Sequence, residues 1–143
     1  MDTAIREELD LVIASRYLPG GRVVNWPLSR RVLSRTANLV AHSVLQVPVT
    51  DCTTGFRVYS RRACEVILAH CGNRGSGFIC LSESLVAVHY SGLRIGEVPS
   101  VFTNRSTGGS AMGLGEIWGG VVGLARIRGL VRELRRSQAG LGR

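Results

Sequence analysis

The sequence contains no lysine and few aromatic residues. All 18 basic side chains are arginines, and with 10 carboxylates they give a net charge of +8 when the histidines are neutral. Charge alone would suggest a nucleic-acid partner. Aromatic residues make up only 6% of the chain, which is too few for the stacking platforms that single strands need, and no nucleic-acid-binding motif is present. The sequence therefore disfavours a nucleic-acid partner.

The sequence also lacks a long hydrophobic run, a secretory signal and any C-x-x-C pair. Its longest stretch poor in charge, Met112 to Ala125, contains Glu116 and is too short to cross a bilayer. The first residues are acidic and no apolar run follows a basic one, which predicts a cytoplasmic protein. The wide spacing of the cysteines predicts no metal site and no disulfide, but small buried or half-buried thiols at Cys52, Cys64, Cys71 and Cys80.

What is present is an alternation of strand and helix patterns in a chain of 143 residues, 45% of them hydrophobic. Strands are expected over 10–15, 56–59 and 93–103, and helices over 27–46, 61–70, 81–90 and 116–136. Loops are expected over 17–26, 46–54 and 72–77, with Ser60 as a helix cap and Gly92 as a helix-ending glycine. Three short strands are few for an independent sheet. We therefore expect an α/β or α+β layer structure that is part of a larger sheet, with its first strand leaving an unpaired edge.

Three basic and hydroxyl side chains form the first candidate site. Arg16 ends the first predicted strand, where open α/β sheets bind their ligands. Arg30 and Ser34 lie one helical turn apart and point the same way, while Arg31 and Arg35 form a parallel pair on the adjacent face. Guanidiniums beside a hydroxyl suit a phosphate, because each arginine offers two aligned donors. A solvated arginine face is the alternative interpretation of this spacing.

Three further segments carry polar residues in unusual places. Asp51 opens a polar turn in which it can accept backbone N–H bonds and Gly55 permits a left-handed backbone. Glu83 lies within an apolar helix, and a buried acid needs a partner such as Arg57. The stretch from Asn104 to Met112 is rich in glycine and serine and is typical of a lid that folds over phosphate, although it lacks the P-loop spacing.

Many short pieces of the chain follow one another in a recognisable order. They are Asp10 to Tyr17, Gly20-Gly21, Asn25 to Pro27, Ser29 to Ser34, Ala37-Asn38, Asp51 to Tyr59, Gly77-Phe78, Glu83, Gly92 to Pro99, Val101-Phe102, Arg105, Gly109-Ser110 and Gly115 to Ile117. In this order and spacing they resemble the C-terminal half of the polyprenol-phosphate (dolichol-phosphate) mannosyltransferases of glycosyltransferase family 2. The resemblance covers about residues 8–130.

The resemblance implies one partial domain over 1–143 with part of the GT-A fold, an incomplete mixed sheet with amphipathic helices. Its parts would be a core over 8–103, a mobile loop over 104–115 and a C-terminal helix over 116–136. It implies transfer of mannose from GDP-mannose to a polyprenyl or dolichyl phosphate with inversion, with Mg²⁺ or Mn²⁺ in the complete enzyme. It also implies a peripheral location at the inner face of the membrane, because the helix from Leu28 matches a segment at the bilayer surface with Trp26 at the interface.

The resemblance also assigns roles to single residues. By position, the acceptor phosphate is held by Arg16, Arg30 and Ser34, while Arg105 and Ser110 belong to the loop that closes on the donor diphosphate. An organising role falls to Thr54, Gly55 and Arg57. A phosphate monoester is already ionised near pH 7, so Asp51 and Glu83 are expected to organise arginines rather than act as bases. The catalytic residues stay open, with Arg105, Ser110, Glu83 and Asp51 as candidates.

Two departures from the family pattern limit what this chain is expected to do alone. Ala111 stands where the family has a lysine. The Asp-x-Asp metal motif is missing, because Asp2, Asp10 and Asp51 are the only aspartates. We therefore expect the chain to hold no metal, to be inactive alone and to need a partner subunit that supplies the donor half. The alternative is a non-catalytic polyprenyl-phosphate-binding or accessory subunit of a complete transferase, and relatives that transfer glucose or N-acetylglucosamine stay open.

Overall fold

The computed structural model describes residues 8–72, 78–103, 123, 127–132 and 134–136. Within these residues strands and helices are interspersed along the chain, which confirms the predicted mixture of α and β structure. The predicted loop over 104–115 lies outside the described residues. Of the predicted helix over 116–136, residues 123, 127–132 and 134–136 are described, and they are helical.

A three-stranded mixed sheet lies at the base of the molecule. β1 (Leu11–Ser15) is its central strand, antiparallel to β3 (Arg57–Tyr59) and parallel to β4 (Ile95–Pro99). The prediction that the first strand leaves an unpaired edge is wrong, because strands from later in the chain flank β1 on both sides. Since β1 and β4 are parallel, their carboxyl ends meet at one edge of the sheet, where ligands commonly bind.

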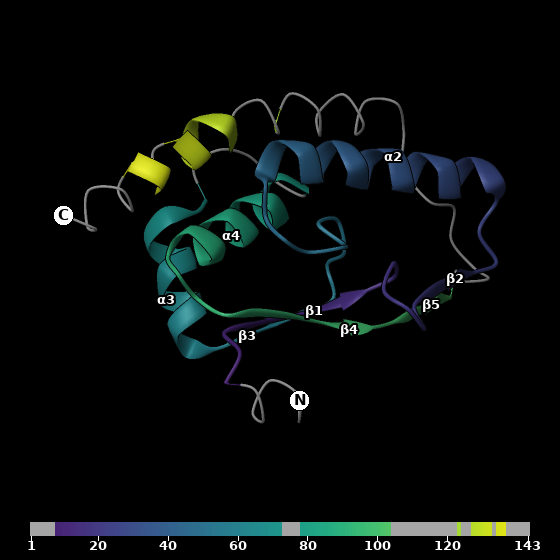
Figure 1. Cartoon of the computed structure of the whole chain (residues 1–143), viewed down its shortest axis with the longest axis horizontal. Helices are drawn as coiled ribbons and strands as arrows, with labels where there is room; N and C mark the ends of the chain where they lie inside the picture. Colours follow the sequence, from purple (N-terminus) through teal and green to yellow (C-terminus); the bar gives the residue numbers. More distant parts are fainter. Residues whose placement is uncertain (1–7, 73–77, 104–122, 124–126, 133, 137–143) are drawn as a thin grey trace.

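A two-stranded sheet continues from that edge. β2 (Arg22–Val24) runs parallel to β5 (Val101–Thr103), although the sequence predicts a loop over 17–26. The N–H of Ser100 donates to the carbonyl of Ser15 at 2.8 Å, and its carbonyl accepts from the N–H of Arg22 at 3.0 Å. The strand predicted over 93–103 is thus two strands in line, joined at Ser100 (Figure 1).

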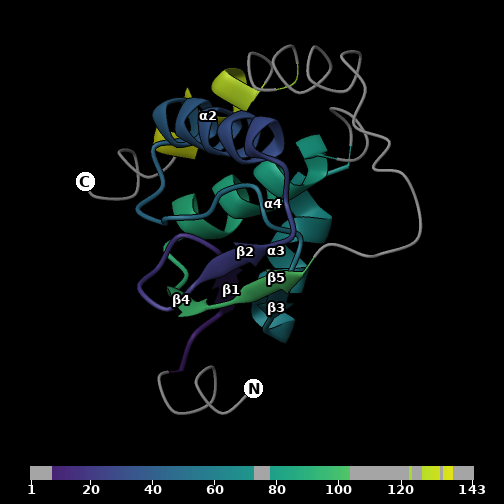
Figure 2. The same cartoon turned by 90° about the vertical axis from the view of Figure 1, so that its right-hand side faces the viewer.

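The helices cover one side of this sheet. α4 (Phe78–Tyr90) lies between the strands and α2 (Leu28–Leu45) in both views (Figures 1 and 2), and α3 (Arg61–His70) packs against α4. The middle of α4, Leu85 to Val88, is fully buried, as expected for a helix that is apolar nearly all round. The core joins this segment to Leu11 and Ile13 of β1, Ala41 and Leu45 of α2, and Ile127 near the C-terminus.

Two of the predicted helix ends are confirmed. The hydroxyl of Ser60 accepts from the N–H of Ala63 at 3.1 Å and caps α3. Gly92 has φ +72°, the left-handed conformation that glycine adopts without strain, and it follows the end of α4. Pro27 precedes α2 at its N-cap, and Gln46 ends that helix with φ +54°.

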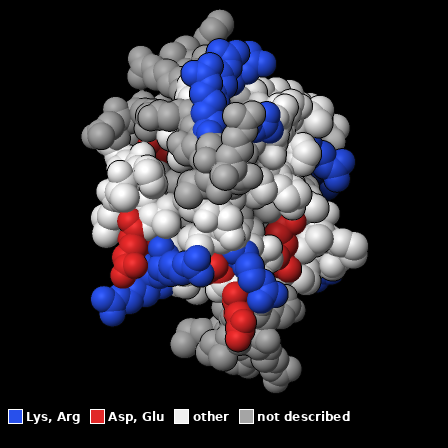
Figure 3. Space-filling view, turned by 60° about the vertical axis from the view of Figure 1, so that its left-hand side comes forward, with Lys and Arg blue, Asp and Glu red and all other residues white. Residues whose placement is uncertain are grey.

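One face of α2 is apolar and exposed. Leu28, Val32 and Leu39, which the sequence places on one face, are 76%, 57% and 66% exposed. Val101 is also exposed, at 51%, and belongs to the short strand β5 of the two-stranded sheet. Charged side chains gather in separate places on the surface: in Figure 3 basic and acidic side chains meet low on the face, and another basic group lies at its top. Among the described helices, none combines the length and the hydropathy needed to cross a membrane.

Candidate phosphate site

A hollow of about 210 Å³ opens where the end of β1 faces the first turns of α2. Its lining contains four arginines and two hydroxyl side chains and no carboxylate: Arg16, Arg22, Arg31, Arg35, Tyr17 and Ser34. The volume is small compared with the pockets of drug-sized ligands, which reach about 300–1,000 Å³. Its size and its charge suit an anionic headgroup.

Arg16 is held in place by a buried carboxylate that does not itself line the hollow. Its Nε donates to Asp51 Oδ2 at 2.7 Å and its Nη2 donates to Asp51 Oδ1 at 2.8 Å. Nη2 also donates to the hydroxyl of Thr53 at 2.7 Å. Asp51 is fully buried, and the side chain of Arg16 is only 9% exposed. Such a two-point pair fixes the plane of the guanidinium as well as its position.

Each member of the Arg16–Asp51 pair stabilises the charged form of the other. Burial by itself would raise the pKa of the Asp51 carboxyl, but the hydrogen bonds and charge of Arg16 outweigh it and hold that pKa below its ordinary value. Burial would likewise lower the pKa of Arg16, and the contacts with Asp51 raise it instead. Because the two charges cancel, the excess positive charge of the hollow comes from Arg22, Arg31 and Arg35.

The turn after Asp51 has the predicted Asx geometry. Asp51 Oδ1 accepts from the backbone N–H groups of Thr53 and Thr54, both at 3.1 Å. Gly55 does not use the left-handed backbone that the sequence suggested, since its φ lies outside the positive range. The turn is closed instead by hydroxyl and carboxylate acceptors, among them Thr54 Oγ1, which accepts from the N–H of Phe56 at 3.2 Å.

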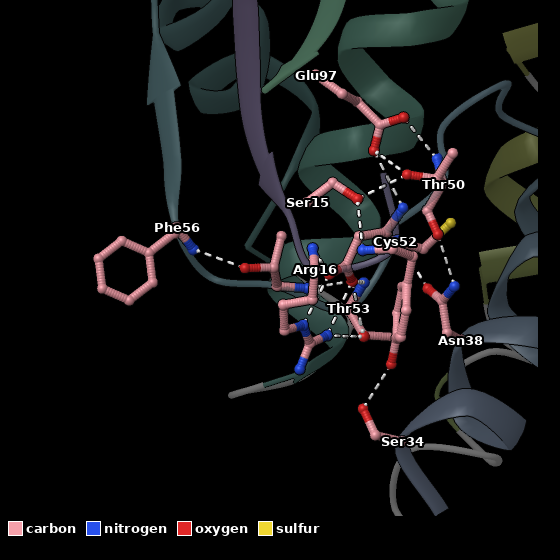
Figure 4. Close-up of polar contacts among 12 residues, drawn as sticks. Ser15, Arg16, Ser34, Asn38, Thr50, Cys52, Thr53, Phe56 and Glu97 are labelled. Atoms are coloured by element: carbon pink, nitrogen blue, oxygen red, sulfur yellow. Dashed lines mark hydrogen bonds and ion pairs between the residues drawn. The ribbon is translucent and has the colours of Figure 1, made fainter. Parts of the chain in front are cut away.

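The opposite wall of the hollow is formed by α2. Ser34 lines it, and its hydroxyl lies 2.9 Å from that of Tyr17, which follows β1. Of the three residues predicted to hold a phosphate, Arg16 and Ser34 therefore share the hollow (Figure 4). Arg30 is not among the lining residues; its guanidinium carbon lies 4.2 Å from the centre of the Trp26 ring. The two arginines of α2 that do line the hollow are Arg31 and Arg35.

Trp26, predicted at a membrane interface, is buried in this structure. It is 8% exposed and packs edge-to-face against Phe102, with ring centres 5.5 Å apart. Because Trp26 also lines the hollow and lies against Arg30, its ring joins β5 to the start of α2. The exposed apolar side chains beside it are those of α2, starting with Leu28.

Arg57 and Glu83, suggested as partners, do not meet. Arg57 donates to three backbone carbonyls, those of Thr54, Leu81 and Cys52, at 2.6 to 3.0 Å. Its guanidinium is thus already occupied at the junction between the Asp51 turn and α4. The fully buried Glu83 accepts from the N–H of Gly72 at 3.3 Å, and its other oxygen has no hydrogen-bond partner within the described residues.

The remaining predicted site residues lie elsewhere. Arg105 and Ser110 fall outside the described residues. Within the part of the chain that is described, no group of three or more His, Cys, Asp or Glu side chains could hold a metal ion. The four cysteines are free thiols: Cys52 is buried and Cys71 half-buried as predicted, whereas the prediction is wrong for Cys64 and Cys80, which are exposed. Burial raises the pKa of Cys52 to about 11, which keeps it protonated near neutral pH.

Two residues that contact the site were given no role by sequence reasoning. Glu97 of β4 and Asn38 of α2 both hydrogen-bond to the segment Thr50 to Cys52, which leads into the Asp51 turn. A carboxylate in the strand Ile95–Pro99, which is otherwise free of charge, is a signal that could have drawn attention to Glu97. Asn38 carries no comparable signal, because polar residues are ordinary on a surface helix.

Arginines clustered at the edge of a sheet suit a phosphate in proteins of many classes and do not define one class by themselves. No protein-family profile matches the chain. It is 39% identical over 141 residues, covering 90% of this chain and 52% of the relative, to the "Polyprenol monophosphomannose synthase" of Mycolicibacterium smegmatis. It is 37% identical over 118 residues, covering 82% of this chain and 48% of the relative, to the "Undecaprenyl-phosphate mannosyltransferase" of Micrococcus luteus.

These matches define a class and then a narrower group. The names of the two relatives imply the glycosyltransferase class, and within it both are named as enzymes that form or transfer mannose onto a polyprenol phosphate, to which this chain is a partial-length homologue. The resemblance predicted from the sequence is thereby confirmed. The chain spans about half the length of the relatives it matches.

Proposed function

We propose that this chain forms the acceptor side of a GT-A glycosyltransferase that transfers mannose from GDP-mannose to a polyprenyl phosphate with inversion. The observation that carries the proposal is the arginine-lined hollow between β1 and α2, placed beside the exposed apolar face of α2. A lipid phosphate combines an anionic head with a long apolar chain, and these two adjoining surfaces match its two parts. The names of the relatives supply the sugar and the lipid class.

The residues of the hollow would position the acceptor rather than activate it. A phosphate monoester is ionised near neutral pH, so its oxygen can attack the anomeric carbon of mannose without a general base. The new carbon–oxygen bond forms as the bond from that carbon to the diphosphate of GDP breaks. Arg16, whose guanidinium is already aligned by Asp51, would fix the orientation of the phosphate. Arg31 and Arg35 on the α2 wall would attract the phosphate electrostatically.

The exposed face of α2 supports a peripheral position at the inner face of the membrane. Leu28, Val32 and Leu39 present apolar side chains, and Arg31 and Arg35 lie on the same helix at the rim of the hollow. A helix with this pattern lies in the plane of the interface, where arginines contact anionic lipid headgroups. In this position the hollow would open toward the headgroup of a lipid still in the bilayer.

The donor side of the reaction requires groups beyond the described residues. In the proposed complete enzyme, Arg105 and Ser110 contact the donor diphosphate, and Mg²⁺ or Mn²⁺ would neutralise it. The second candidate function is lipid-phosphate binding without turnover, as an accessory subunit or with a partner that supplies the donor half.

The proposal is tested by measuring binding of a short-chain polyprenyl phosphate in detergent micelles. We expect the unaltered chain to bind, and Arg16→Ala to weaken binding by about tenfold or more, as for the loss of a charged hydrogen bond. Arg61→Ala is the matched control, because Arg61 is 95% exposed and pairs with Glu65 on α3. Equal binding by Arg16→Ala and the control would contradict the proposal.

Two further arms sharpen the assignment. Arg30→Ala tests the role given by the resemblance, and Arg31→Ala tests the role given by the lining of the hollow. A second assay with labelled GDP-mannose separates the two candidate functions. Binding without sugar transfer would favour the accessory role, and transfer by the purified chain alone would show that no separate donor half is required.

A further inference from the structure

The segment Thr50 to Cys52 runs between the two walls of the hollow. On one side lie the strands β1 and β4, and on the other side lies α2 (Figure 4). This segment overlaps the turn from Asp51 to Thr54, in which the carboxylate of Asp51 binds Arg16. The position of this segment therefore sets the position of Arg16 relative to Ser34 and the arginines of α2.

Glu97 holds the segment from the sheet side with three hydrogen bonds. Its carboxylate accepts from the N–H of Thr50 at 2.7 Å, from the hydroxyl of Thr50 at 2.9 Å and from the N–H of Asp51 at 3.1 Å. Thr50 has one hydroxyl proton, and it points at Glu97. The hydroxyl of Ser15, 2.6 Å from that of Thr50, must then be the donor of the contact between them. Glu97 is thus linked to both members of the Arg16–Asp51 pair. It binds the backbone of Asp51 directly, and through Thr50 it is linked to Ser15, the residue before Arg16.

Asn38 holds the same segment from the helix side. Its Nδ2 donates to the carbonyl of Thr50 at 2.7 Å, and its Oδ1 accepts from the N–H of Cys52 at 2.8 Å. Both ends of one amide group therefore bind the backbone of the segment, one residue to each side of Asp51. Asn38 lies one helical turn after Ser34, so this contact ties the α2 wall directly to the turn.

Neither residue lines the hollow, so neither is placed to touch a ligand there. Their hydrogen bonds end on Thr50, Asp51 and Cys52, and Asp51 passes the constraint on to Arg16 through two short contacts. We infer that Glu97 and Asn38 are positioning residues, which set the separation of the two walls and thereby the affinity for a lipid phosphate. This inference rests on the proposed function.

The test compares binding of a short-chain polyprenyl phosphate in detergent micelles by single and double variants. Glu97→Gln keeps the shape of the side chain but replaces one accepting oxygen with a donor. Asn38→Asp keeps the acceptor for Cys52 and loses the donor to Thr50. Each is repeated in an Arg16→Ala background, because two residues that act through one group show non-additive effects. Thr36→Ala, an exposed change on α2, and Glu65→Gln, an exposed carboxylate on α3, are the matched controls.

We expect each single variant to weaken binding about fivefold to tenfold, the effect of one or two lost hydrogen bonds. In the Arg16→Ala background the same changes should have almost no further effect. Full binding by both single variants would overturn the inference while leaving the proposed function intact. An equal loss in both backgrounds would also overturn it, because the residues would then act independently of Arg16. Absence of binding by the unaltered chain would overturn the proposed function and the inference with it.

A ligand-free measurement covers the case in which a variant is too unstable for the assay. The Nε–H signal of Arg16 in a nitrogen-15 spectrum reports its bond to Asp51. Asn38→Asp and Glu97→Gln should shift this signal in the folded chain, and the control variants should not. An unshifted signal in both variants would overturn the inference.

Discussion

The two walls of the hollow use arginine in opposite ways. On the β1 wall Arg16 is nearly buried and clamped by a carboxylate in a hydrogen-bonded turn. On the α2 wall Arg31 and Arg35 are exposed, and no described carboxylate pairs with them. A buried, paired arginine keeps its direction but contributes little net charge, whereas exposed arginines contribute charge that salt screens. Under the proposed function, one wall would therefore orient the anion and the other would attract it.

Breaking the clamp is expected to give the largest effect. Asp51→Ala leaves the guanidinium of Arg16 without its partner in a buried site and removes the acceptor that closes the turn. Removing one partner of a buried pair costs about 3–5 kcal/mol in unfolding free energy. The measurement is urea unfolding, with Glu65→Ala of the exposed pair on α3 as the control, where the loss should stay below about 1 kcal/mol. A loss this small for Asp51→Ala as well would show that the clamp contributes no more than a surface pair.

A smaller effect is expected from crowding the backbone behind Arg16. A Cβ placed on Gly21 would lie 2.7 Å from the carbonyl oxygen of Ser15 and 2.9 Å from the carbonyl carbon of Arg16. These are backbone atoms of the β1 wall and cannot rotate away, so Gly21→Ala should destabilise the chain by about 1–3 kcal/mol. Gly55→Ala is the matched control, since its Cβ would meet only Leu81 at 3.9 Å. Thermal unfolding measures the midpoint temperatures of the two variants. Equal midpoints would mean that the backbone of Ser15 and Arg16 moves to accept the added methyl group at little cost.

The sequence predicts the features of the fold and the site that depend on local patterns, and it misses those that depend on contacts between distant residues. Arg16 at the end of a strand, the Asx turn at Asp51 and the cap at Ser60 follow from local patterns, because each depends on neighbours a few residues away. The strand Arg22–Val24 is stabilised by pairing with Val101–Thr103, and glycine and proline before it mask its pattern. The contacts of Glu97 and Asn38 join residues far apart in the chain, so no local spacing reports them.

The choice between Arg30 and its neighbours shows the same limit. Helical spacing places Arg30 and Ser34 on one face, and it equally places Arg31 and Arg35 together. Which face meets the sheet depends on how α2 is rotated, and that rotation is fixed by Ala41 and Leu45 in the core and by Asn38 on the turn. Helical spacing therefore identified the group of arginines on α2 but not which of them line the hollow.

The α2 wall should respond to salt where the β1 wall does not. Arg31→Ala and Arg35→Ala should each weaken binding to vesicles of anionic lipid by about 1 kcal/mol, or roughly fivefold, at low ionic strength. At high salt the difference from the unaltered chain should disappear, because the exposed charges are screened. Vesicle co-sedimentation at two salt concentrations measures this, with Arg61→Ala as the control on α3. A difference that persists at high salt would mean that these arginines make short, dry contacts with the lipid.

Of the four predicted effects, the loss of stability in acid is expected to be the smallest. The pKa of Asp51 lies below its ordinary value because Arg16 stabilises the charged form. A carboxyl with a lowered pKa in the folded state adds stability that is fully present above its unfolded pKa and is lost as pH falls through the folded one. Asp51→Asn keeps an acceptor for the turn but does not titrate, so its stability deficit relative to the unaltered chain should shrink as pH falls below about 4. Urea unfolding from pH 5 to pH 2 measures the deficit, and a constant value across this range would contradict the assignment of the charge pair as the source of that stability.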